Sequence, residues 1–187
     1  MTDSEYPPIL AELHRDHRDF TRIISALEDE LQKIRRGESE NWKRLADSFE
    51  YFEAYSDLVH HPREDILYCY CRDVCTTTRP ALEGLALEHA EIAGKTARLR
   101  RQLDEVFADG MLNRDMLIGE IEGYLAMQKA HMRREETKIF PMLLDTLGEA
   151  DWARLLQSKV SDVDPLFDED ARQAYDALYR RIVSREP

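Results

Sequence analysis

Residues 10–34 read LAELHRDHRDFTRIISALEDELQKI, and the spacing of the apolar side chains in this segment is that of a long α-helix. Residues that recur every three or four positions line one face of a helix. The only polar side chain on the recurring positions is His17, and Gly37 is expected to end the helix. The recurring positions are Leu10, Leu13, His17, Phe20, Ile24, Leu27, Leu31 and Ile34.

Three further segments carry the same pattern. Pro62 lies within the first of them and should kink or restart the helix, because proline cannot donate a backbone hydrogen bond. The next helix follows a loop expected at residues 73–80, with Pro80 suited to its first turn. Pro141 is expected to end the regular part of the last one. The expected helices span Asn41 to about Arg72, Leu82 to Val106, and Leu117 to Ile139.

The composition also favours helices. Leu, Ala, Glu and Arg dominate, Val is scarce, and only 7 Gly and 7 Pro interrupt the chain. No segment alternates apolar and polar residues over a strand's length, so no sheet is expected. Helices of roughly 25–30 residues joined by short links favour antiparallel neighbours. We therefore expect an all-α fold, an antiparallel up-down-up-down four-helix bundle.

The bundle is expected to span residues 8–147, and residues 148–187 are expected to form a C-terminal helical extension. Within the extension, residues 149–160 should form a short helix. Residues 169–183 should form an amphipathic helix that buries Ala174, Leu178 and Ile182. The extension is expected either to pack on the bundle or to form a homodimer.

Length and charge exclude several classes of protein. A chain of 187 residues with 43% apolar residues is large enough for one domain with a sizeable core. Its net charge of −12 repels phosphate backbones, so general nucleic-acid binding is not expected. No apolar run approaches about 18 residues, so no transmembrane helix is expected. The opening MTDSEYPP resembles neither a signal peptide nor a transit peptide.

Three cysteines lie close together, and their number is odd. This pattern is typical of free thiols in a reducing compartment rather than of a disulfide framework. We therefore expect a cytoplasmic protein. The cysteines are Cys69, Cys71 and Cys75.

Each expected helix places one histidine at or near its core face. A single inward histidine is more often a hydrogen-bonded core residue than a ligand, but four buried imidazoles in one core all need partners. Glu64 follows His60 by four residues, and Glu135 follows His131 by the same interval, so each pair lies on one helix face. The four histidines are His17, His60, His89 and His131.

These histidines fall at similar heights along an antiparallel bundle. His17 and His89 each lie about nine residues after the start of a helix, His131 about nine residues before the end of one, and His60 about twelve. At about 1.5 Å per residue, these positions agree within roughly one turn. Imidazole and carboxylate ligands suit iron, zinc or manganese. Six ligands are too many for one tetrahedral zinc ion and suit two metal ions bridged by carboxylates, as in di-iron helix bundles.

Four motifs, in order, resemble the hemerythrin-like (HHE cation-binding) family over about residues 8–145. The segment HHPRED at residues 60–65 is similar to the HHxxEE-type segment that gives the family its name. The resemblance implies a non-haem di-iron centre that binds dioxygen or related small ligands. The other matching segments are LHRDHR at 13–18, LEH at 87–89, and HMRREE at 131–136 followed by IFP at 139–141.

Carried onto this sequence, the resemblance implies that Glu64 and Glu135 bridge two iron ions. The sequence departs from the oxygen-carrying hemerythrins, which have two third-helix histidines four residues apart. Here the positions four residues from His89 are Leu85 and Ala93, and neither can bind a metal. The implied histidine ligands are His17, His60, His89 and His131.

The missing ligand has two candidates, His61 and His14. His61 precedes Pro62, where a distorted helix would turn it inward, and we include it among the expected metal ligands. His14 lies off the apolar stripe, which favours a place beside the ligands or at the surface. Asp65 and Glu136 are expected to be solvated or to hydrogen-bond the ligand imidazoles.

The leading hypothesis is a protein that binds or senses O2, NO or iron through two non-haem iron ions. The resemblance is to the divergent branch of the family, which includes iron- and oxygen-sensing members, so reversible oxygen carriage is not the first expectation. The alternative is an enzyme-like role, either in protection against peroxide or nitric oxide or in iron donation to damaged clusters. The sequence contains no phosphate loop, hydrolytic triad or nucleotide motif.

Overall fold

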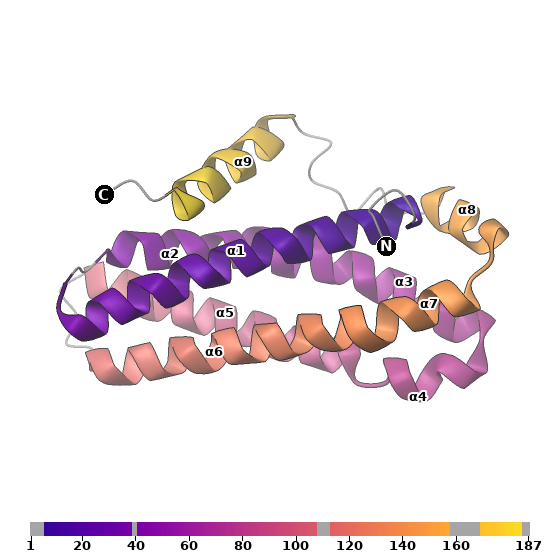
Figure 1. The fold of residues 1–187 in the computed structure, drawn as a ribbon, viewed down its shortest axis with the longest axis horizontal. Helices are drawn as coiled ribbons and strands as arrows, with labels where there is room; N and C mark the ends of the chain where they lie inside the picture. Colours follow the sequence, from indigo (N-terminus) through magenta and orange to yellow (C-terminus); the bar gives the residue numbers. More distant parts are fainter. Residues whose placement is uncertain (1–5, 39–40, 108–112, 158–168, 185–187) are drawn as a thin grey trace.

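The computed structural model describes residues 6–38, 41–107, 113–157 and 169–184, and every regular element in these ranges is helical. This confirms the all-α prediction. Long helical segments lie side by side along the long axis of the molecule (Figure 1). They are α1 (Pro8–Arg36), α2 (Trp42–Tyr51) continuing into α3 (His61–Val74), α5 (Leu85–Phe107), and α6 (Arg114–Arg134) continuing into α7 (Phe140–Thr146).

The first helix follows the predicted pattern. Every predicted stripe position in α1, from Leu10 to Ile34, is buried, including His17. Gly37 ends the helix in the left-handed conformation with φ of 69°, and its N–H donates to the carbonyl of Ile34. Glycine adopts this conformation without the steric penalty of a Cβ atom.

The second segment stays helical through the position where proline was expected to disturb it. The residues Phe52–His60 form a π-helical stretch between α2 and α3, and Pro62 lies in the first turn of α3. The first turn of an α-helix is the position that best tolerates proline, because its fixed φ suits the helix there. The predicted disturbance is therefore a change of hydrogen-bonding pattern just before Pro62, and π-helical turns occur often at functional sites.

The loop expected at residues 73–80 is shorter in the structure, because α3 runs to Val74 and the next helix begins at Arg79. The expectation that Pro80 lies in a first turn is confirmed. A 3-10 turn at Thr76–Thr78 is followed by the short helix α4 (Arg79–Leu82), and Pro80 lies in the first turn of α4. The long helix α5 begins only at Leu85, after Gly84 with φ of 88°. The sequence pattern did not reveal this break because Leu82 and Leu85 keep the helical spacing across it.

Pro141 was expected to end a helix, and this was wrong. A second π-helical stretch, Glu135–Ile139, follows α6, and Pro141 lies in the first turn of α7. The helical segment therefore continues to Thr146. Both prolines are accommodated in the same way, each just after π-helical turns.

The C-terminal part contains α8 (Glu149–Gln157) and α9 (Glu169–Val183). The predicted end of the short helix, residues 158–160, lies outside the described residues. The α9 helix packs against α1 and α2 (Figure 1) and buries Leu178 and Ile182. Ala174 is exposed, so the prediction that it belongs to the buried face was wrong. The division into a bundle and an extension at residue 147 stays a prediction.

Two apolar clusters fill the core, one on each side of a polar layer. The larger one includes Phe20, Phe49 and Ile121, and the other includes Leu13, Leu67 and Leu143. In each long segment the inward histidine lies between residues of the two clusters. The polar layer is thus shielded from water at both ends. Among the described residues, no helix has the length and apolar character needed to cross a membrane.

Candidate metal centre

The polar layer contains all seven predicted metal ligands, and every one of them is buried. The side chains of Glu64 and Glu135 are 0% exposed, and none of the histidines exceeds 5%. Each long helical segment contributes at least one of these residues. They are His17 on α1, His60 at the end of the first π-helical stretch, His61 and Glu64 on α3, His89 on α5, His131 on α6, and Glu135 at the start of the second π-helical stretch.

One group consists of His17, His60 and Glu64. Their candidate ligand atoms lie within 4.8 Å of one another. The Nε2 atoms of His17 and His60 are 3.1 Å apart, and Oε1 of Glu64 lies 3.3 Å from Nε2 of His60 and 3.6 Å from Nε2 of His17. Two ligands at right angles, each about 2.1 Å from one metal ion, would be separated by about 3 Å.

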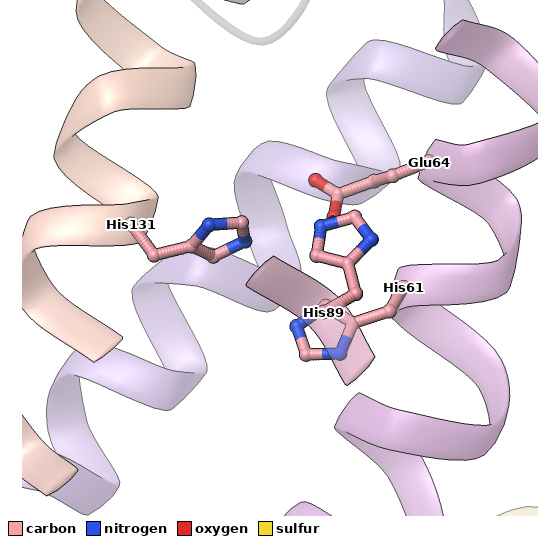
Figure 2. Close-up of side chains that lie close together, drawn as sticks. All are labelled: His61, Glu64, His89 and His131. Carbon is pink, nitrogen blue, oxygen red and sulfur yellow. The ribbon is translucent and has the colours of Figure 1, made fainter. Parts of the chain in front are cut away.

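A second group consists of His61, Glu64, His89 and His131, again with ligand atoms within 4.8 Å of one another. Figure 2 shows their side chains turned toward one another from α3, α5 and α6. Oε2 of Glu64 lies 3.5 Å from Nε2 of His89. The rings of His61 and His89 are stacked, with centroids 4.3 Å apart and planes tilted by 8°.

The two glutamates connect the groups. Glu64 directs Oε1 toward His17 and His60 and Oε2 toward His89, so each oxygen faces a different group. Glu135 also spans both, because its Oε2 lies 3.3 Å from Nε2 of His131 and 3.5 Å from Nε2 of His17. Both carboxylates therefore lie between the two groups of histidines.

In four of the histidines, the ring nitrogen that points away from the centre, Nδ1, forms a hydrogen bond with a carboxylate. In the neutral imidazole, a carboxylate on Nδ1 fixes the proton there and leaves the lone pair on Nε2, which faces the centre, as in metal-binding histidines generally. The Nδ1–oxygen pairs are His17 with Glu136 at 3.1 Å, His60 with Asp16 at 3.0 Å, His89 with Asp65 at 2.9 Å, and His131 with Glu88 at 3.3 Å.

Asp65 and Glu136 were expected either to be solvated or to hydrogen-bond the ligand imidazoles, and both contact an imidazole. The roles of Asp16 and Glu88 were missed in the sequence. Each directly precedes an inward histidine in the chain but pairs with a histidine of another helix. A further carboxylate, Asp57, lies 3.3 Å from Nδ1 of His61.

Tyr68 was also missed. Its hydroxyl donates a hydrogen bond of 2.8 Å to Oε1 of Glu135. The residue follows Glu64 by four positions on α3, so the helical spacing that picked out Glu64 could have found it.

The two candidates for the missing third-helix ligand occupy different surroundings. His61 is a member of the second group. The ring of His14 instead contacts the rings of Tyr6 and Phe140, at 4.6 and 5.1 Å between centroids. His14 belongs to neither group among the described residues.

The electrostatics of the layer separate His61 from its neighbours. Burial works to lower the pKa of His17, but the carboxylates of Glu136 and Glu64 outweigh it and raise the pKa to about 9. Burial also works to lower the pKa of His60, but Glu64 and Asp16 outweigh it and raise the pKa to about 10. At His89, Asp65 and Glu135 outweigh burial in the same way, and the pKa again rises to about 10. For His61, burial and the neighbouring histidines hold the pKa well below its usual value.

Several atoms at the centre lack a hydrogen-bond partner among the described residues. Leaving a buried carboxylate oxygen unpaired is costly. Imidazole nitrogens and carboxylate oxygens are ligands that iron, zinc and manganese accept, so bound metal ions would satisfy these atoms and the residues fit such a group. The atoms are both carboxylate oxygens of Glu64, Oε2 of Glu135, Nε2 of His89 and Nε2 of His131.

Comparison with known proteins gives one match. A family model described as the hemerythrin HHE cation binding domain matches residues 9–143. The match covers more than half of the 187 residues and includes all seven candidate ligands. Neither the curated proteins nor the solved structures contain a match to this chain.

Proposed function

This chain belongs to the hemerythrin HHE cation binding family of metal-binding helical proteins, and we propose that it is a non-haem di-iron protein that binds or senses O2, NO or iron itself. The observation that carries the proposal is Glu64. Its two oxygens face different histidine groups, and neither oxygen has a hydrogen-bond partner among the described residues. A carboxylate in this position serves two metal ions better than one.

We assign the ligands by group. One ion would be held by His17 and His60 and the other by His61, His89 and His131, and Glu64 and Glu135 would be shared by both. His61 would fill the place that the third helix leaves empty, and its lowered pKa favours the neutral imidazole, which is the form that binds a metal ion.

A pair of iron ions would supply electrons and open coordination positions for O2 or NO. The chain supplies the rest. The outer carboxylates hold the imidazoles in place, Tyr68 holds Glu135, and the two apolar clusters exclude bulk water from the layer. Such a site suits small uncharged ligands.

Three further expectations, on helix topology, oligomeric state and location, remain part of the proposal. The order in which the segments follow one another supports an antiparallel up-down-up-down four-helix bundle. A homodimer through the extension stays a prediction, and the apolar residues Leu178 and Ile182 of α9 are used within the chain. A cytoplasmic location also stays a prediction.

The test is an optical titration of iron-loaded protein, made first without oxygen and then with O2, NO and peroxide in turn. Iron analysis should give about two iron ions per chain. A stable spectral change with O2 or NO supports a binding or sensing protein. Rapid consumption of peroxide, or loss of iron, favours the stress-protection or iron-donation alternative. A single tightly bound zinc ion that iron cannot replace contradicts the proposal.

A further inference from the structure

The outer carboxylates of the centre are not equivalent. Glu136, Asp65 and Glu88 each have about 40% of the side chain exposed, so water can complete their hydrogen bonds. Asp16, which faces His60, has only 10% of its side chain exposed. A buried carboxylate needs protein donors on both oxygens.

Tyr55 supplies the second donor. Its hydroxyl donates a hydrogen bond of 3.0 Å to Oδ1 of Asp16, while Oδ2 of Asp16 lies 3.0 Å from Nδ1 of His60. The phenol of Tyr55 therefore determines where the carboxylate lies, and the carboxylate determines how the His60 ring is turned. Tyr55 acts on the centre through another residue and is a positioning residue.

The C-terminal helix α9 covers this tyrosine. The ring of Tyr175 meets the ring of Tyr55 edge-on at 5.7 Å, and the Tyr175 hydroxyl donates to the carbonyl of Ala54 at 3.3 Å. The ring of Tyr51 contacts both Tyr55 and α9. It stacks on the ring of Tyr55 with centroids 5.6 Å apart, and its centroid lies 6.1 Å from that of Tyr179 of α9.

Polar contacts fix the rest of α9 on the bundle. The hydroxyl of Tyr179 donates to Asp19 of α1 at 2.9 Å, and Arg181 donates to Asp47 of α2 at 2.8 Å. The buried apolar side chains of α9 that complete the contact are Leu178 and Ile182. Tyr175, Tyr179 and Val183 of α9 are partly buried against the same apolar cluster. A single helix can open locally while the rest of the fold stays intact, so docking of α9 can respond to its neighbours.

We infer that docking of α9 is coupled to the metal ion held by His17 and His60, through Tyr55 and Asp16. The inference rests on the proposed function, because it needs an ion on Nε2 of His60. A metal ion on Nε2 would fix the orientation of the His60 ring, and the contact of 3.0 Å between Nδ1 and Asp16 passes that restraint on to Tyr55 and so to α9. Coupling of this kind is reciprocal, so undocking of α9 weakens the same ion.

Only one of the two metal positions is expected to be coupled to α9. His89 and His131 contact Asp65 and Glu88, which are open to water, and no hydrogen-bond chain like the one through Tyr55 is recorded from either carboxylate to α9 among the described residues. The ion held with His61, His89 and His131 should therefore be insensitive to α9. This asymmetry separates coupling from a general loosening of the fold.

The experiment titrates full-length protein with Fe2+ without oxygen, in competition with a chromogenic chelator, and follows hydrogen exchange of the α9 amides. Tyr55→Phe removes the hydroxyl and keeps the ring. Tyr175→Ala removes the covering ring. The matched control is Tyr70→Phe, which removes a hydroxyl bonded at 2.7 Å to Asp151, a contact between α3 and α8.

We expect Fe2+ to slow exchange in α9 of the wild type. Tyr55→Phe should weaken one of the two Fe2+ sites by about 5–50-fold, within the usual range of coupling, and should reduce the slowing in α9. Tyr175→Ala should weaken the same site, and the double variant should lose less than the two single losses combined. Tyr70→Phe should change neither site.

Three results would overturn the inference. The first is wild-type protein that binds two Fe2+ ions while hydrogen exchange of the α9 amides stays unchanged. The second is equal weakening of both sites, which indicates a structural effect. The third is additive losses in the double variant. In each of these the proposed function stands, whereas wild-type protein that binds no Fe2+ overturns the proposed function and this inference together.

Discussion

Tyr68 donates a hydrogen bond of 2.8 Å to Oε1 of Glu135, and both side chains are buried. Burial and the charge of Glu135 raise the pKa of Tyr68 well above its usual value, so the phenol remains a donor at every physiological pH. The bond holds Glu135 so that Oε2 faces both His17 and His131. Tyr68 thus orients the carboxylate for which we propose a bridging role between two metal ions.

Tyr68→Phe should lower the affinity for Fe2+ by about 10-fold or more, the usual cost of losing a group that orients a metal ligand. Both ions should be affected, because Glu135 faces both histidine groups. Competition with a chelator measures the effect, and Tyr70→Phe on the same helix is the control. Unchanged affinities would show that Glu135 needs no such support.

Glu64→Ala should abolish binding of both ions. Its oxygens face His60 and His89 separately, so one substitution removes a ligand from each group. Iron analysis after expression with ample iron gives the result, and a melting curve shows whether the variant is folded. A folded variant that keeps one ion at full occupancy would contradict the bridging role.

His61→Ala should reduce occupancy to about one ion, because His61 belongs only to the second group. His14→Ala should leave both ions in place, since the His14 ring packs against Tyr6 and Phe140 instead. Iron counts and the magnetic coupling between the irons distinguish the variants. If His14→Ala removes iron and His61→Ala does not, the assignment of the extra ligand is reversed.

The sequence predicted the helices and the residues of the polar layer because both follow one rule. Inward positions recur every three or four residues, and His17, His89 and His131 occupy such positions. The breaks in the helices follow other rules. The π-helical stretches at Phe52–His60 and Glu135–Ile139 depend on how hydrogen bonds shift by one residue, which side-chain spacing does not report.

Two of the four outer carboxylates, Asp16 and Glu88, escaped prediction for a geometric reason. Successive residues on a helix are turned by about 100°, so the neighbour of an inward ligand lies on the flank, facing the next helix. Asp16 beside His17 therefore reaches His60, and Glu88 beside His89 reaches His131. Which helix is the neighbour depends on the packing, and periodicity alone does not supply it.

Iron should stabilise the fold. Without metal, the layer contains buried carboxylate oxygens that have no hydrogen-bond partner among the described residues. An ion at about 1,000 times its Kd contributes about 4 kcal/mol, which corresponds to a rise in Tm of about 8–16 °C for a chain of this size. Melting curves with and without Fe2+ measure it. Identical curves from pH 5 to 8 would show that the ligands do not bind metal in the core.

Loading with iron should release protons, and the release should depend on pH. In the metal-free protein the neighbouring carboxylates raise the pKa values of His17, His60 and His89 to about 9, 10 and 10. The contact of 3.1 Å between Nε2 of His17 and Nε2 of His60 holds one proton between the two rings, so at pH 7 this pair carries one extra proton and His89 carries another. Their contribution to stability is complete below pH 6.5, the pKa of unfolded histidine, and disappears as the pH rises through 9–10.

A metal ion binds only the neutral imidazole, so Fe2+ must displace these protons. We expect about two protons released per chain at pH 7, one from the His17–His60 pair and one from His89, and fewer at pH 10, where these groups are already partly deprotonated. As the pH rises from 7 toward 10, the metal-free protein loses stability from these groups, and the difference in Tm between loaded and metal-free protein should widen. A pH-indicating dye in weak buffer without oxygen counts the protons as Fe2+ is added. Equal release at both pH values would show that these imidazoles are not the metal ligands.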